Sequence, residues 1–161
     1  MDNPEWADFI PGLKQGGPKC RLPPHEDCTP LDVEAAARHL EAGGTLGGME
    51  GYESRPGQLD MLRAVTRAFN NREHLMIEAG TGVGKSLAYI IPSVLWSFTN
   101  DTPVVLSTAT RNLQSQLLTS DLPRATLTLG EDAPKLRVAV LKSPSSTYIR
   151  SLYSLLRVLP T

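Results

Sequence analysis

Cysteine is scarce in this sequence of 161 residues, in which Cys20 and Cys28 are the two present. A small secreted domain held together by disulfides needs more of them, so two free thiols in a reducing compartment are expected. No apolar run is long enough to cross a bilayer. The opening residues, MDNPEWADFI, lack the basic and apolar regions of a secretory signal. We therefore expect a cytoplasmic protein.

The net charge of −1 conceals an uneven distribution of charge along the chain. Residues 1–60 carry 5 Lys/Arg and 11 Asp/Glu, whereas residues 61–161 carry 11 Lys/Arg and 6 Asp/Glu. After Asp132 there are five bases and no acid. This excess of bases weakly favours a polyanionic partner, but a solvated basic face is the commoner explanation. Charge alone leaves the partner open.

Residues 1–30 are rich in proline and glycine and lack hydrophobic periodicity, which predicts a flexible leader. Asp32 is suited to cap a first helix, and Gly43-Gly44 ends it. From Gln58, apolar residues at spacings of three and four predict an amphipathic helix. Further helices are expected at 85–99 and 110–125, and buried strands at 74–79, 103–109 and 136–142. This alternation predicts an α/β fold with a mostly parallel sheet and crossover helices.

The stretch EAGTGVGKS, residues 78–86, interrupts the apolar pattern between a predicted strand and a predicted helix. Glycines in such a turn direct successive backbone N–H groups inward, and the helix that follows presents its positive end to an anion. Lys85 is placed to reach the β- and γ-phosphates of a nucleotide, and Ser86 offers a hydroxyl to Mg²⁺. The expected phosphate-binding residues are Ala79, Gly80, Thr81, Gly82, Val83, Gly84, Lys85 and Ser86. A plain glycine-rich connector does not explain Lys-Ser at the start of the helix.

Three stretches, in this order and spacing, resemble motifs of one helicase family. YESRPGQLDM (52–61) resembles the adenine-recognition segment of the DinG/XPD-like superfamily-two DNA helicases. EAGTGVGKSLAYIIP (78–92) resembles their phosphate loop, including Ala79 in place of the first glycine. VVLSTATRNLQSQL (104–117) resembles the next motif, which touches the nucleic-acid backbone. The resemblance covers residues 31–142 and is strongest to the DinG-type members.

The first stretch carries the residues that the resemblance assigns to the adenine base. Gln58 has one amide acceptor and two donors, which complement an adenine edge, but a bond to nearby backbone is the plainer alternative. Arg55 precedes Pro56-Gly57 in a turn that aims Gln58. Tyr52 either stacks on the base or simply packs.

The third stretch carries the residues that the resemblance assigns to DNA. Thr108 and Thr110 lie at the end of a predicted strand, at the edge where parallel sheets hold ligands, and Arg111 adds positive charge. Hydroxyls and backbone N–H groups hold phosphates without reading the base sequence. From propensity alone, Thr110 as a helix cap and Arg111 as a solvated side chain are equally good interpretations.

The resemblance implies an enzyme that moves along single-stranded or forked DNA and hydrolyses ATP, with Mg²⁺ as cofactor. In that enzyme Lys85 is the catalytic residue, and it contacts the phosphates of ATP. It implies two RecA-like P-loop NTPase lobes that close on ATP, and an iron–sulfur domain inserted in the first. Hydrolysis also needs an acidic box after a later strand. The four acids that follow Lys85 are Asp101, Asp121, Glu131 and Asp132. None of them ends an apolar strand.

The end of the chain departs further from the family pattern. A cluster of this kind needs four thiolates, and no cysteine follows Cys28, so a cluster is not expected. No part of the second lobe is expected within these 161 residues. We interpret 51–142 as a partial RecA-like ATP-binding domain, preceded by a helix and loop at 31–50. Residues 143–161 fit a truncated or frame-shifted product, and we expect them to form a short amphipathic helix over the open sheet.

Two other functions are compatible with the motifs. A small self-contained P-loop kinase suits the length of the chain, but it needs its own acidic metal ligand and an arginine-rich lid. A non-catalytic protein that binds nucleotide or DNA needs neither. Under the helicase interpretation, the chain binds ATP, and turnover by this chain alone is not expected. The sequence does not fix the oligomeric state, and a monomer is expected.

Overall fold

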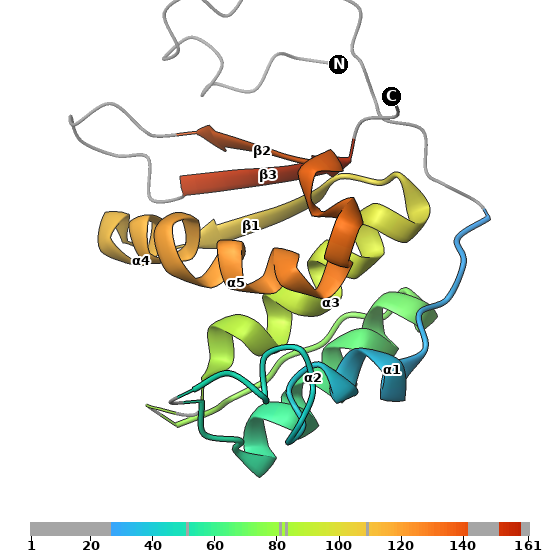
Figure 1. Ribbon diagram of the computed structural model, residues 1–161. Coiled ribbons are helices and arrows are strands. Elements are labelled where there is room, and N and C mark those ends of the chain that lie inside the picture. The colour runs from blue at the N-terminus through green and yellow to red at the C-terminus, as the bar shows by residue number, and fades with distance from the viewer. Residues whose placement is uncertain are drawn as a thin grey trace, which may run out of the picture.

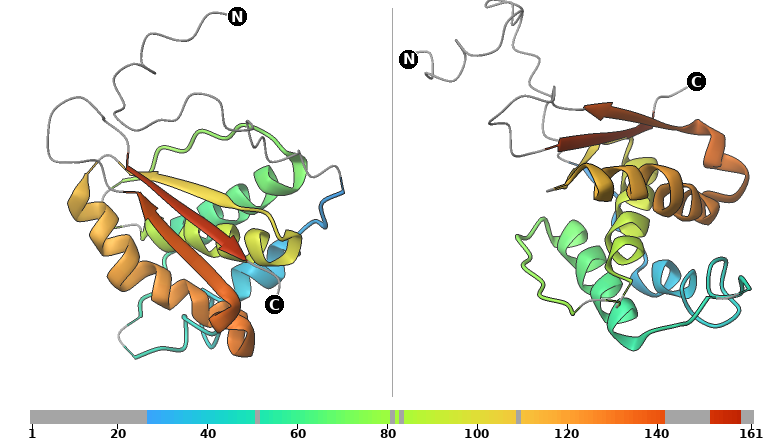
Figure 2. Two further views of the ribbon diagram at one scale, coloured as in Figure 1. Left: turned by 90° about the horizontal axis from the view of Figure 1, so that it is seen from above. Right: turned by 90° about the vertical axis from the view of Figure 1, so that its left-hand side faces the viewer.

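The computed structural model describes residues 27–50, 52–80, 82, 84–108, 110–141 and 152–158. The predicted leader therefore lies almost entirely outside the described residues. The described chain forms three layers: a small sheet, a middle layer of helices, and a pair of helices furthest from the sheet (Figures 1 and 2). The mixed α/β composition expected from the sequence is confirmed.

The outer layer consists of α1 (Val33–Arg38) and α2 (Pro56–Asn71). Asp32 caps α1 as predicted, because its carboxylate accepts from the N–H groups of Glu34 and Ala35. Pro56 opens α2, where a missing N–H costs nothing. Arg63 of α2 pairs with Glu34 and Glu41 at 2.9 and 3.0 Å, which fastens the first helix and its following turn to the second.

The middle layer is built on α3 (Lys85–Asn100), which is buried along most of its length. Its apolar residues Ile90, Ile91 and Val94 are fully buried, and Leu62 and Leu40 pack into the same core. A helix that is apolar on most sides needs cover on several faces. Here α2 covers one side of α3, and the helical stretch α4–α5 lies along another.

The predicted helix after the second motif is present but changes character along its length. It begins as α4 (Arg111–Gln116), continues as a π-helical segment (Leu117–Asp121) and ends as α5 (Leu122–Thr126). A 3-10 segment (Leu127–Lys135) then leads to the sheet. In the described part of the chain, no helix has the length and apolar character needed to span a membrane.

The sheet contains β1 (Val104–Thr108), β3 (Leu152–Val158) and β2 (Leu136–Leu141), in that spatial order. Its central strand β3 pairs antiparallel with both neighbours, with Val104 opposite Leu156 and Leu136 opposite Val158. The parallel pairing expected from the sequence is therefore not what the described strands form. β1 and β2 run in the same direction, but an opposed strand lies between them.

The C-terminal prediction was wrong in the same place, because residues 152–158 form a strand and not a helix. A strand inserted between β1 and β2 pairs with the facing edge of each, whereas a helix laid over the sheet would leave those edges without partners. Helical and extended apolar patterns are hard to distinguish in short segments, and here pairing with two strands decides the outcome.

The predicted strand at 74–79 was also wrong. The run is irregular in the structure, and Leu75, Met76 and Ile77 are 46%, 97% and 36% exposed. In the described residues no strand lies beside it, so its backbone has no ladder to join. An apolar run has the composition of a strand, but only a neighbouring strand can make it one.

Candidate nucleotide-binding site

The glycine-rich turn stands directly before the first turn of α3. Gly84 is the N-cap residue of α3, with φ +76°, and Gly82 has φ +80°. Both angles lie in the left-handed region that glycine adopts without strain. Thr81 and Val83, predicted to bind phosphate, lie outside the described residues. Among the described residues no side chain caps α3, so its first N–H groups are left for another acceptor.

Lys85 folds back over the turn. Its Nζ donates to the carbonyl oxygens of Ala79 and Gly80, both at 2.7 Å. The ammonium thus lies among the residues that were predicted to surround a phosphate. A phosphate oxygen is a stronger, charged acceptor for an ammonium than a neutral carbonyl is. Lys85 can therefore exchange these carbonyls for an anion without leaving the turn.

Gln58 joins the N-terminal end of α2 to the glycine turn. Its Nε2 donates to the Gly84 carbonyl at 2.7 Å, and its Oε1 accepts from the Tyr52 hydroxyl at 2.6 Å. The side chain is 3% exposed. The plainer alternative, a bond to backbone, is therefore present. Beyond these two described bonds, the amide has one more N–H and one more lone pair, which is the combination that an adenine edge requires, so the predicted base contact stays a prediction.

Two further groups hold this corner of the site. Arg55 donates from its guanidinium to the Gly82 carbonyl and pairs with Glu53 at 3.1 Å. Burial raises the pKa of the Tyr52 hydroxyl, and the positive charge of Arg55 opposes that rise. The neutral hydroxyl that Gln58 needs as a donor is thus preserved at neutral pH.

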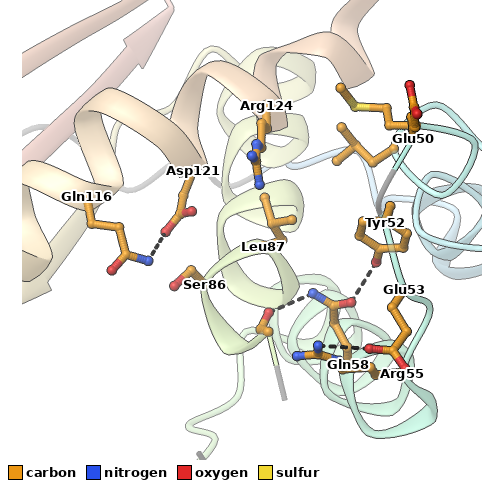
Figure 3. Close-up of a pocket in the computed structure, with 13 residues that line it drawn as sticks. Glu50, Tyr52, Glu53, Arg55, Gln58, Ser86, Leu87, Gln116, Asp121 and Arg124 are labelled. Carbon is orange, nitrogen blue, oxygen red and sulfur yellow. Dashed lines mark hydrogen bonds and ion pairs between the residues drawn. The ribbon is translucent and has the colours of Figure 1, made fainter. Parts of the chain in front are cut away.

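A cavity of about 340 Å³ opens beside these residues (Figure 3). Gly84, Ser86 and Gln58 line one side of it, and Tyr52, Glu50 and Arg55 line another. The α4–α5 stretch supplies the remaining wall with Gln116, Asp121 and Arg124, whose side chains point into the cavity in Figure 3. The cavity is therefore lined by residues of the first two motifs, by Gln116 at the end of the third, and by Asp121 and Arg124 from further along the chain.

Asp121 was not predicted to be a site residue, because it ends no predicted strand, yet it lines the cavity. It is 7% exposed, and its Oδ2 accepts from Gln116 Nε2 at 3.0 Å. A signal for it was available: Asp121 falls on the buried face of its helical stretch with Leu117 and Ala125. A carboxylate on an apolar face is rarely placed there for packing.

Ser86, expected to serve Mg²⁺, lies on the cavity wall in the first turn of α3. Burial raises the pKa of the Tyr89 hydroxyl, hydrogen bonding with the Ser86 side chain opposes this rise, and the charge of Asp121 adds to it. Ser86 and Asp121 therefore act on the Tyr89 hydroxyl in opposite directions.

The residues predicted to contact DNA are not among the described residues that line this cavity. Thr108 ends β1, is 6% exposed, and donates from its hydroxyl to the Thr110 carbonyl at 3.4 Å. The Thr110 hydroxyl accepts from the Leu113 N–H at 3.2 Å and so caps α4. Arg111 is the first residue of α4. The helix-cap interpretation of Thr110 is therefore confirmed, and DNA contact by the three residues stays a prediction.

The residues of this chain suit a nucleotide but not an iron–sulfur cluster. The two left-handed glycines, the uncapped α3 and the Lys85 ammonium form a donor set suited to phosphate. A four-thiolate cluster does not fit a sequence with two cysteines. Among the described residues, no group of three or more His, Cys, Asp or Glu could hold a metal ion.

Comparison with known proteins supports the resemblance found in the motifs. The chain is 51% identical over 75 residues to a 3'-5' exonuclease DinG of Bacillus subtilis. It is 47% identical over 85 residues to an ATP-dependent helicase DinG of Mycobacterium tuberculosis, and 41% identical over 75 residues to an ATP-dependent DNA helicase YoaA of Haemophilus influenzae. The chain resembles DinG-type helicases.

The matches cover only part of this chain and a smaller part of each relative. The three matches cover 47%, 53% and 47% of this chain, but only 8%, 13% and 11% of the respective relatives. The chain therefore spans about a tenth of these curated relatives. No protein-family model matches the chain, and no solved structure does.

Proposed function

We propose that this chain is an ATP-binding part of a DinG-type, ATP-dependent DNA helicase. Lys85 contacts the β- and γ-phosphates, the backbone of residues 79–84 surrounds them, and Ser86 holds Mg²⁺ through the nucleotide. Gln58 and Arg55 serve the adenine side. The proposal includes a partial RecA-like lobe, a cytoplasmic location and single-stranded or forked DNA as the partner.

One observation carries this proposal. The first turn of α3 has a glycine cap without a side-chain acceptor, and the one lysine of that turn lies on the carbonyls of the preceding loop. Helix N–H groups, left-handed glycines and a nearby ammonium together favour a polyphosphate over a neutral ligand. The relatives named ATP-dependent helicases support ATP as that ligand.

We further propose that this chain binds ATP without sustaining its hydrolysis. Turnover needs a carboxylate that orients water and metal at the γ-phosphate. Among the acids after Lys85, Asp101 and Glu131 are exposed. Asp121 alone of the four lines the cavity, and its carboxylate is already bonded to Gln116.

The test is binding of a fluorescent ATP analogue to the full chain and to Lys85→Ala. Loss of charge-assisted bonds to phosphate is expected to weaken binding about tenfold to a hundredfold. Arg67→Ala is the matched control, because it removes a cation from the exposed face of α2 and leaves the cavity intact. Equal affinity of Lys85→Ala and the native chain would refute the site.

Phosphate release, measured with and without single-stranded DNA, separates the remaining functions. Binding without release fits the proposal. Release stimulated by DNA would show a complete motor and refute the loss of hydrolysis. Release that depends on a small acceptor and not on DNA would favour a kinase.

A further inference from the structure

The segment that leads into α1 is held by two asparagine side chains. Asn70, in the last turn of α2, accepts from the Leu31 N–H and donates to the Leu31 carbonyl, both at 2.8 Å. Asn100, the last residue of α3, accepts from the Thr29 N–H at 2.7 Å and donates to the Thr29 carbonyl at 3.2 Å. Each amide therefore engages both backbone groups of one residue.

The two asparagine side chains make the hydrogen bonds that a neighbouring β-strand would make to this segment. In an extended segment, the backbone groups of residues two apart point to the same edge. Thr29 and Leu31 have that spacing, and each meets one carboxamide, which has a donor and an acceptor side by side. Asn100 is 9% exposed and also donates to the Trp96 carbonyl at 3.3 Å, so its amide is oriented before the segment arrives.

We propose that Asn70 and Asn100 form a clamp for extended polypeptide main chain, and that residues 28–31 of the same chain occupy it. We call residues 28–31 the strap. The clamp recognises the backbone of the strap and not its side chains, since Thr29 and Pro30 are exposed. The proposal stands apart from the nucleotide site and does not depend on it.

The position of the clamp gives the strap two tasks. Helices α2 and α3 begin together at the glycine turn and end together at the clamp, as Figure 1 shows. The strap therefore joins the far ends of the two helices that carry Gln58 and Lys85. Through Cys28 it also lines a cavity of about 400 Å³, to which the stacked rings of Phe69 and Trp96 contribute as well.

The test is amide hydrogen exchange at residues 29 and 31 in the full chain. Asn70→Ala is expected to speed exchange at Leu31, and Asn100→Ala at Thr29, each about tenfold. Asn71→Ala is the matched control, because the neighbouring Asn71 is exposed and its amide contacts Glu73 at 3.4 Å and not the strap. The amide of Leu62 in the core reports whether each variant remains folded.

Two conservative variants separate hydrogen bonding from packing. Asn70→Asp keeps an acceptor for the Leu31 N–H, so Leu31 should stay more protected than in Asn70→Ala. Thr29→Ala should leave the backbone N–H of residue 29 protected, because that bond does not involve the side chain. Labelling of the Cys28 thiol in a Cys20→Ser background should accelerate in Asn100→Ala, because the strap then leaves the cavity.

Three results would overturn the proposal. Unchanged exchange at both amides in the folded double variant Asn70→Ala/Asn100→Ala would show that the clamp does not hold the strap. Release by Thr29→Ala as strong as by Asn100→Ala would show recognition of the side chain. Protection that falls on dilution of the protein would show that a second copy supplies the strap.

Discussion

Two junctions of this chain have the same plan, an apolar run followed by small residues and a helix, but they end differently. At the first, Leu75–Ile77 is irregular and exposed, and Gly84 begins α3 without a side-chain cap. At the second, β1 is paired with β3, and the Thr110 hydroxyl caps α4. The first helix start leaves N–H groups for a ligand, whereas the second uses one of them internally.

This difference distinguishes a helix start that can bind a ligand from one whose N–H groups are partly bonded within the protein. A side-chain cap contributes about 1 kcal/mol to stability, so its absence from a helix of 16 residues has a cost that a ligand can recover. At the uncapped junction the Lys85 ammonium is also held close by, and a cavity opens. The capped junction has neither feature in its described contacts.

The largest effect that sharpens this comparison is expected from Gly84→Ala. A Cβ there would lie 2.4 Å from Gln58 Nε2, with φ at +76°. Strain and loss of the Gln58 bond together should lower the free energy of unfolding by about 3 kcal/mol and weaken ATP binding. Urea unfolding and analogue titration measure the two effects.

The matched control for that variant is Gly82→Ala. Gly82 has φ +80°, but no described atom lies within 4 Å of the position that an added Cβ would take, so only strain of about 1–2 kcal/mol is expected. The gap between the two variants measures the close approach of Gln58. If both variants lose the same stability, Gln58 does not anchor the turn.

A smaller effect is expected at the second junction from Thr110→Ala. Loss of the hydroxyl that accepts from the Leu113 N–H should lower the free energy of unfolding by about 1 kcal/mol. Thr110→Ser keeps an acceptor and should retain most of that stability. ATP affinity should be the same in all three chains, and a loss in Thr110→Ala would link the two junctions.

The smallest effect is expected from Tyr52→Phe, which removes the donor to Gln58 Oε1. About 0.5 kcal/mol of unfolding free energy should be lost at neutral pH, because the hydrogen bond is only partly buried. Since burial raises the pKa of Tyr52 above its ordinary 10.0, its contribution is complete below pH 10 and disappears as the pH rises through the folded value.

The measurement for this variant is unfolding stability from pH 8 to 11, on the scale set by the ordinary tyrosine pKa of about 10. The native chain should lose stability more steeply at high pH than Tyr52→Phe. A decline remains in the variant because the pKa of Tyr89 is raised as well. Identical curves for the two chains would mean that the Tyr52 hydroxyl titrates alike when folded and unfolded.

Local signals predicted the helices well and the sheet poorly. Asp32 at the start of α1, the apolar spacing of α2 and the position of Lys85 in α3 depend on neighbours within a few residues. The failure at 74–79 and at 152–158 has a different origin, because a strand exists only where another strand pairs with it. Residue pattern alone did not contain that information.

The same distinction applies to the site. The motifs placed Gln58, Gly84, Lys85 and Ser86 around one function, and the structure brings Gln58 and Gly84 into contact. Asp121 and Arg124 enter the cavity from a helical stretch that follows a different motif. Their contribution depends on how α5 packs against α3, which no local spacing encodes.

The sequence by itself determined the helix starts, the glycine turn with its lysine, and the likeness to DinG-type helicases, because each depends on residues adjacent along the chain. Tertiary structure decided which apolar runs became strands, which acid entered the cavity, and how two asparagines came to hold the strap. These outcomes depend on groups that meet only after folding, when buried backbone groups must find partners across the chain.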